Sequence, residues 1–236
     1  MTADAGRTAD SEGRGRTRRV WWVAGGAVVL ALVLAGVAAF ASARGEGESG
    51  VPAADSADAG FARDMAVHHQ QAVEMSFIVR DRTDDEDVRR LAYDIANTQA
   101  NQRGMLLGWL DLWELPKLAP DGAGPMAWME GMEGGEGHGE HGGGHGSSGG
   151  GGLMPGMATK DELKRLGGLR GEQAEVFFLQ LMTDHHKGGV SMAEACASLC
   201  AVPVEKRLAR GMVEGQQSEL GLMRDMLAAR GAKPRS

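Results

Sequence analysis

Two adjacent histidine pairs, each set among methionines, are the residues best suited to chemistry in this chain. The stretch FARDMAVHHQQAVEM spans residues 61–75, and FLQLMTDHHKGGVSM spans residues 178–192. At a constant offset of 117 positions, the histidines and two methionines of the first stretch fall on those of the second. The duplicated set consists of Met65, His68, His69, Met75, Met182, His185, His186 and Met192.

These residue types at this spacing can bind a soft metal ion. Residues three and four apart share a helix face, so Met65, His68 and Met75 form one stripe. Adjacent histidines point about 100° apart, so one of each pair can face the bundle centre and the other a groove or solvent. Imidazole and thioether together suit copper, and Cu(I) in particular, with silver similar and zinc gaining little from methionine. We predict that a Met-x-x-His-His cluster can close on one ion.

Two other interpretations of the histidine pairs stay open. Methionine fills helix cores readily, and the histidines could be satisfied core polar groups in an envelope module that has a structural or interaction role. Histidine and methionine can also be axial haem ligands. The chain contains no C-x-x-C-H sequence, which excludes covalently attached haem of that type.

The apolar pattern predicts an all-α fold. Helices are expected over residues 58–82, 83–115, 160–168, 171–200 and 203–230. Thr83 and Thr159 each open a candidate capping box, and Pro116 ends the second helix. Each half is therefore one helical hairpin, and two hairpins that bury their apolar faces together form a four-helix bundle of the ferritin-like type.

Polar residues on the second helix of each hairpin also repeat. Gln99 and Gln102 correspond to Gln216 and Glu219. These four are candidates to support the metal ligands. We expect Gln99 and Glu219 to hydrogen-bond the second imidazole nitrogen and orient the rings.

Residues 117–158 form a linker rich in glycine, methionine and histidine, which cannot bury a core and is expected to be flexible. Its composition favours metal capture by Met126, Met129, Met132, His138, His141 and His145. Cys196 and Cys200 lie beyond the second motif. They are either soft ligands or buried apolar residues, because Cβ atoms four apart in a regular helix match disulfide geometry poorly.

The N-terminal part predicts attachment to a membrane. Residues 1–19 are a basic tail, residues 20–42 are an uncharged apolar run long enough to span a bilayer, and residues 43–57 are a tether. The folded part then lies outside the cytoplasm, either anchored or, after cleavage at Ala43, secreted. A net charge of −7 does not favour a nucleic-acid partner. Another envelope protein is a possible partner.

The motifs together resemble a bacterial family, domain of unknown function number three hundred and five, of the ferritin-like superfamily. The resemblance rests on both Met-x-x-His-His stretches, the Gln-x-x-Gln and Gln-x-x-Glu pairs, and Met154-Pro155-Gly156-Met157. It implies a helical-bundle domain and, for some members, copper binding outside the cytoplasm. Gln102 departs from the family's usual glutamate, and Gly189, which stands where the first half has Ala72, is expected mainly to loosen packing.

The expected function is copper buffering, sequestration or transfer without catalysis. Di-iron oxidases of ferritin-like fold need four inward carboxylates and two Glu-x-x-His motifs. Here methionine stands three residues before each first histidine, and only Glu219 is a plausible inward carboxylate. The sequence therefore does not favour an oxidase.

Overall fold

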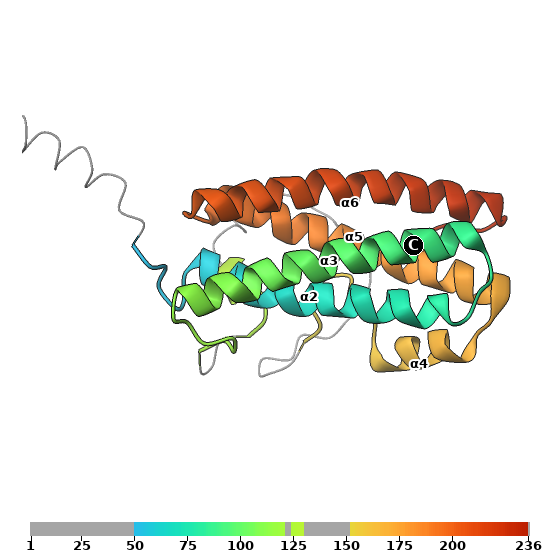
Figure 1. The fold of residues 1–236 in the computed structure, drawn as a ribbon, viewed down its shortest axis with the longest axis horizontal. Helices are drawn as coiled ribbons and strands as arrows, with labels where there is room; N and C mark the ends of the chain where they lie inside the picture. Colours follow the sequence, from blue (N-terminus) through green and yellow to red (C-terminus); the bar gives the residue numbers. More distant parts are fainter. Residues whose placement is uncertain (1–49, 121–123, 130–151, 236) are drawn as a thin grey trace, which may run out of the picture. The chain divides into compact units, whose positions relative to one another are not determined.

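Apolar residues at three- and four-residue spacing form long helices in the computed structural model (Figure 1), which describes residues 50–120, 124–129 and 152–235. Within these ranges the chain has five α-helices, one short 3-10 helix and no strand. The elements are α2 (Ala57–Arg80), α3 (Glu86–Leu112), η1 (Ala127–Met129), α4 (Lys160–Gly168), α5 (Gly171–Leu199) and α6 (Pro203–Ala229). The predicted all-α class is confirmed.

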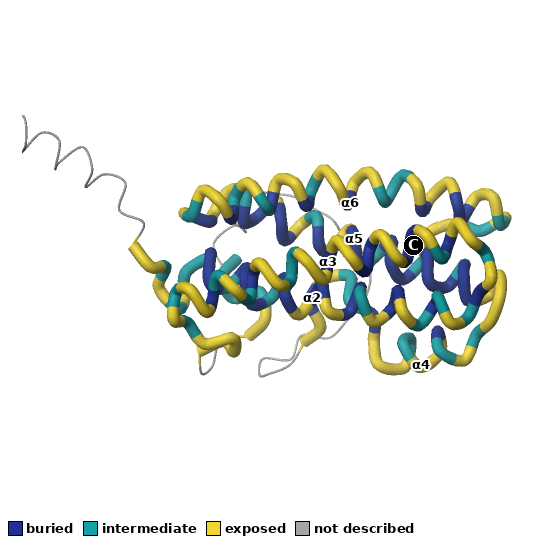
Figure 2. Tube along the Cα trace, viewed as in Figure 1, coloured by how far each residue is buried: buried dark blue, intermediate teal, exposed yellow. Residues whose placement is uncertain are grey.

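The sequence repeat appears as two helical hairpins. Helix α3 packs on α2, α6 packs on α5, and α2 lies against α5, which joins the hairpins. Buried positions run along the inward faces of these four long helices (Figure 2). Each hairpin therefore covers the apolar face of the other. The short helix α4 lies beside α2 and α5 (Figure 1).

Two apolar clusters fill the space between the helices. One contains Met75 and Met182, and the other contains Met65 and Met192. Each cluster takes one motif methionine from each hairpin. The first methionine of one motif thus shares a cluster with the last methionine of the other, which is the arrangement expected when α2 and α5 run antiparallel.

One of the two predicted capping boxes is wrong. Helix α3 begins after Asp85, whose carboxylate accepts the backbone N–H of Val88 at 2.9 Å. Thr83 lies two residues before this cap, where its hydroxyl accepts the backbone N–H of Asp85 at 2.9 Å and donates to the buried carboxylate of Glu175. The capping box at Thr159 is confirmed and opens α4.

Both described ends of the linker are fixed to the bundle, contrary to the expectation that the whole of residues 117–158 is flexible. At one end Asp64 accepts the backbone N–H of Met126 at 2.8 Å and the indole N–H of Trp128 at 2.9 Å. At the other end Gln71 exchanges two hydrogen bonds with the backbone of Ala158. Residues 130–151 lie outside the described part.

The predicted tail and membrane span, residues 1–42, also lie outside the described residues. Among residues 50–120, 124–129 and 152–235, no helix combines the length and apolar character that crossing a bilayer requires.

Candidate metal centre

All four helical histidines are fully buried between the two hairpins. His68 of α2 and His185 of α5 stack with ring centroids 3.7 Å apart. This stack lies where the hairpins meet, at the centre of the repeat. The expectation that one member of each pair could face solvent is wrong, because the second histidines His69 and His186 are as buried as the first.

The second histidine of each pair is held by its own hairpin partner. His69 Nε2 lies 2.7 Å from Gln102 Oε1, and His186 Nε2 lies 2.6 Å from Glu219 Oε2. Gln102 and Glu219 are counterparts in the repeat, so the amide takes the place of the carboxylate in the first hairpin. The hydrogen bond expected from Glu219 is present. The same expectation for Gln99 is wrong, because Gln102 occupies that place.

The first histidine of each pair is held by backbone carbonyls. His185 Nε2 lies 2.9 Å from the carbonyl oxygen of His68, and His68 Nε2 lies 3.2 Å from that of Pro155. All four Nε2 atoms therefore face oxygen acceptors. A carbonyl oxygen has no proton to donate, so Nε2 of His68, His69 and His185 carries the proton, and in a neutral ring Nδ1 keeps its lone pair.

The four Nδ1 atoms are buried and have no hydrogen-bond partner. Burial, the largest cause, lowers the pKa of His68 to about 4 and that of His69 to about 3, and it lowers the pKa of His185 well below the usual value. These rings are therefore neutral at pH 7. A neutral imidazole with a fixed Nε2–H and a free Nδ1 lone pair is the form that binds a metal ion.

The motif methionines supply thioethers to the same interior. Met65, Met75, Met182 and Met192 are all fully buried. The two methionines of one motif lie in different core clusters. Each motif therefore contributes one thioether to each cluster, rather than both to a single group of ligands. Among the described residues, no helical histidine belongs to a group of three histidine, cysteine or carboxylate ligand atoms within 4.8 Å of one another. The buried thioethers are candidates for further donors at the histidines.

Gln99 and Gln216 are buried, and neither side-chain amide has a hydrogen-bond partner. A Cβ at Gly189 would lie only 2.5 Å from Gln216 Oε1. The expectation that Gly189 mainly loosens packing is therefore wrong, since the missing side chain makes room for this amide. Both amides leave polar atoms free inside the bundle, next to helices that carry the histidines.

The Met154–Met157 segment delivers a backbone carbonyl to the site. It crosses α5 so closely that a Cβ at Gly188 would lie 1.9 Å from the Pro155 oxygen. Gly156 has a φ of +76°, and a Cβ there would lie 2.1 Å from the Asp184 oxygen. Two glycines thus allow the backbone contact that places Pro155 on His68. Sequence analysis missed this contact, although two consecutive glycines inside a helix were a signal for it.

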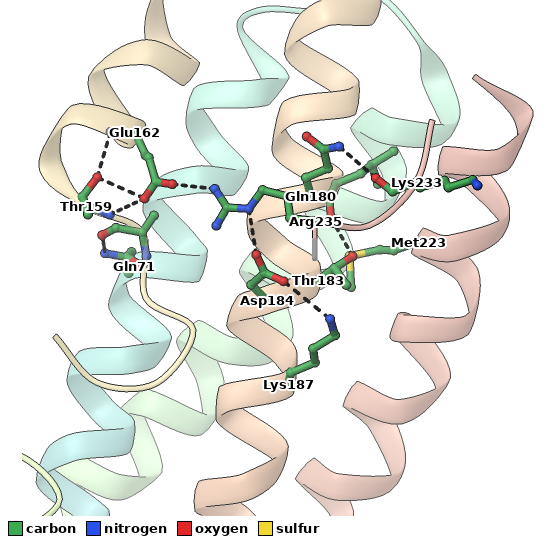
Figure 3. A network of polar contacts seen from close by, with 12 residues as sticks. Gln71, Thr159, Glu162, Gln180, Thr183, Asp184, Lys187, Met223, Lys233 and Arg235 are labelled. Carbon is green, nitrogen blue, oxygen red and sulfur yellow. Dashed lines mark hydrogen bonds and ion pairs between the residues drawn. The ribbon is translucent and has the colours of Figure 1, made fainter. Parts of the chain in front are cut away.

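The C-terminal tail covers α5 beside His185. Arg235 donates from Nε to Asp184 at 2.8 Å and from a terminal nitrogen to Glu162 of α4 at 2.5 Å (Figure 3). Asp184 directly precedes His185 in the chain. The tail, α4 and α5 are therefore fixed together on the outer side of the histidine stack.

Only some of the predicted linker ligands fall within the described residues. Met126 and Met129 are half-buried, and Met126 packs against the cluster that contains Met65. Met132, His138, His141 and His145 lie outside the described residues.

The two cysteines form a disulfide, with Cα atoms 4.8 Å apart. In this oxidised state the cysteines are neither free soft ligands nor simple apolar residues. The argument from helix geometry against a disulfide is therefore wrong here. Cys200 lies directly after α5, which ends at Leu199.

Two hairpins around four buried imidazoles define a duplicated helical protein with a candidate metal centre. The chain belongs to the DUF305 family, described as a domain of unknown function, whose model matches residues 58–227. The resemblance inferred from the motifs is confirmed. No curated protein matches the chain.

Several solved structures have a similar fold. A DUF305 protein from Streptomyces coelicolor is 65% identical, with a TM-score of 0.67, and the match covers 78% of this chain and 99% of that one. A DUF305 fragment from Deinococcus radiodurans is 30% identical, with a TM-score of 0.56, over 73% and 96% of the two chains. CopM in its Cu(I)-bound form is 18% identical, with a TM-score of 0.52 over 73% and 96%, a likeness that concerns the fold.

Proposed function

We propose that this protein binds copper, chiefly as Cu(I), through its buried histidines and methionines, and that it buffers, sequesters or passes on the ion without catalysis. The observation that carries the proposal is the set of four buried Nδ1 atoms without partners. Leaving a buried polar atom unpaired costs about 1–3 kcal/mol, so four together call for a ligand that accepts lone pairs. A metal ion is such a ligand.

The choice of copper follows from the other donors. The motif methionines Met65, Met75, Met182 and Met192 are buried in the two clusters that the hairpins share. Thioether is a soft ligand that favours Cu(I), whereas zinc would use only the imidazoles. Silver has the same preference. Gln102 and Glu219 would not bind the metal themselves but would orient His69 and His186 by hydrogen bonds to Nε2.

CopM supports this choice. Structures of that protein are described in Cu(I)-, Cu(II)- and silver-bound forms, with TM-scores of 0.51–0.52 against this chain. The similar protein from Streptomyces coelicolor is described as a candidate secreted protein. We therefore place the function outside the cytoplasm. The linker, fixed at its ends through Asp64 and Gln71, would capture ions and deliver them to the bundle.

A Cu(I) competition titration of the purified full chain against a chromophoric chelator tests the proposal. We expect tight binding that falls by at least about tenfold in the double variant Met65→Leu, Met182→Leu. Leucine replaces methionine at nearly constant volume, so the fold is retained. The matched control is Met223→Leu with Met226→Leu, which alters two buried methionines outside the motifs and should leave the affinity unchanged.

Replacing His68, His69, His185 and His186 with alanine together should abolish tight binding in the same titration. Circular dichroism establishes whether this variant keeps its helices. Tight binding that survives in a folded variant would move the ion to the linker. Absence of tight binding in the unaltered chain would favour the structural or interaction module instead.

A further inference from the structure

The junction between α5 and α6 holds a second group of side chains that can bind a metal ion, and their ligand atoms are sulfur and oxygen rather than imidazole nitrogen. Cys196, Cys200 and Glu205 place one ligand atom each within 4.8 Å of one another, and all three residues are buried. In the described part of the chain this is the one group of three such ligands that lie this close. The histidine centre uses none of them.

The junction is rigidly built. Asp58 of α2 accepts the backbone N–H groups of Ala201 at 3.0 Å and Val202 at 2.7 Å. These are the residues between Cys200 and the first turn of α6, which begins at Pro203. The hydrogen bonds fix Glu205, in that first turn, relative to the two sulfurs.

Glu205 lies beside Asp58 inside this junction. Its side chain is fully buried, and neither carboxyl oxygen has a hydrogen-bond donor. Burial first, and then the neighbouring Asp58, raise the pKa of Glu205 to about 9. A carboxyl group held neutral beside two sulfurs has a proton that a cation can displace.

We propose that reduction of the Cys196–Cys200 disulfide opens a buried site for a thiophilic divalent ion, with Zn²⁺ as the representative, formed by two thiolates and the Glu205 carboxylate. A dithiol reductant supplies two electrons and two protons to the sulfur–sulfur bond and becomes a cyclic disulfide. The ion then displaces one proton from each thiol and one from Glu205, and these protons pass to solvent. In the oxidised form the sulfurs are bonded to each other and the site is closed.

The ligand set favours a divalent ion over Cu(I). Two thiolates and a carboxylate carry three negative charges, and burial of such charges requires strong compensation. Zinc accepts both cysteine sulfur and carboxylate oxygen, whereas Cu(I) gains little from a carboxylate. Asp58 adds a further acidic group beside Glu205. This site is independent of the proposed copper function, because it shares no ligand with the histidine centre.

The test compares Zn²⁺ binding by the full chain in its two redox states. The protein is reduced with excess dithiothreitol without oxygen, desalted, and shown by thiol titration to contain two thiols. Zn²⁺ is then titrated in competition with a chromophoric chelator. The histidines and the linker are the same in both states, so the oxidised protein is its own control. We expect the reduced protein to bind one more Zn²⁺ ion than the oxidised protein.

Variants assign the extra ion to its ligands. The double variant Cys196→Ser, Cys200→Ser should bind the same amount of Zn²⁺ before and after reduction. Glu205→Gln keeps the shape of the neutral side chain but cannot supply a carboxylate. It should weaken binding of the extra ion by at least about tenfold. Glu194→Gln removes an exposed carboxylate of α5 and should change nothing. Equal stoichiometry in the two redox states, or full affinity in Glu205→Gln, would overturn the proposal.

Discussion

Between pH 6.5 and pH 4 the metal-free protein is expected to lose several kcal/mol of folding free energy through its buried histidines. In the folded state the pKa is about 4 for His68 and about 3 for His69, against an ordinary value of 6.5. Below pH 6.5 the unfolded chain therefore binds protons that the folded protein excludes. Stability falls as pH falls through this window, by about 1.4 kcal/mol per pH unit for each such histidine. His68 alone contributes on the order of 3 kcal/mol by pH 4.

Glu205 acts in the opposite direction and must be removed from the comparison. Its pKa of about 9 lies above the ordinary 4.5, so the folded protein gains stability as pH falls from 9 towards 4.5. We therefore make the measurement in the Glu205→Gln background, by urea unfolding at several pH values. Adding His69→Leu should reduce the slope of the unfolding free energy against pH by about 1.4 kcal/mol per pH unit, which corresponds to one proton. A flat profile from pH 6.5 to 4 in Glu205→Gln would contradict neutral, buried imidazoles.

The second large effect is expected from Gly188→Ala. The new methyl group would lie 1.9 Å from the carbonyl oxygen of Pro155 and 2.5 Å from its carbonyl carbon, so backbone must move. Overpacking of this kind costs about 1–3 kcal/mol. Moving Pro155 also removes the acceptor of His68 Nε2, which leaves a buried donor unpaired at a similar cost. We expect a total loss on the order of 3 kcal/mol, together with weaker Cu(I) binding.

The matched control for this variant is Gly211→Ala. Gly211 lies on an exposed part of α6, where an added Cβ meets no atom within 4 Å. Alanine is favoured over glycine inside a helix by about 0.5–1 kcal/mol, so this variant should be slightly more stable. Urea unfolding of both variants checks the pair. Equal stability of Gly188→Ala and the unaltered protein would show that the Pro155 segment does not pack on α5 as described.

The helices and the histidine quartet were accessible from sequence because they depend on local pattern and duplication. Periodic apolar residues set the helices, and α4, α5 and α6 begin at or next to the residues predicted for them. The offset of 117 singled out the histidine pairs and the Gln102 and Glu219 counterparts. Which of Gln99 and Gln102 meets His69 depends on the rotation of α3 against α2, which periodicity does not determine.

The errors share a different cause, which is competition from residues far along the chain. Thr83 has the pattern of a cap, but Asp85 caps the helix while the Thr83 hydroxyl bonds the Asp85 N–H and the distant Glu175. The Cys196–Cys200 disulfide joins residues at the end of α5 whose spacing alone does not predict a bond. The acceptor of His68 is a backbone carbonyl, which no side-chain motif records. Contacts of this kind come from tertiary packing. In the sequence, the only sign of them is a glycine at the point of close contact, such as Gly188.

The most direct test of the central claim is ¹⁵N NMR of the histidine side chains before and after one equivalent of Cu(I), which is diamagnetic. The metal-free protein should show neutral rings protonated at Nε2 for His68, His69 and His185, and single substitutions of these residues and of His186 assign the signals. Copper should shift Nδ1 resonances of this set and leave the Nε2 protons in place. Shifts confined to His138, His141 and His145, with the four buried rings unchanged, would contradict a copper site inside the bundle.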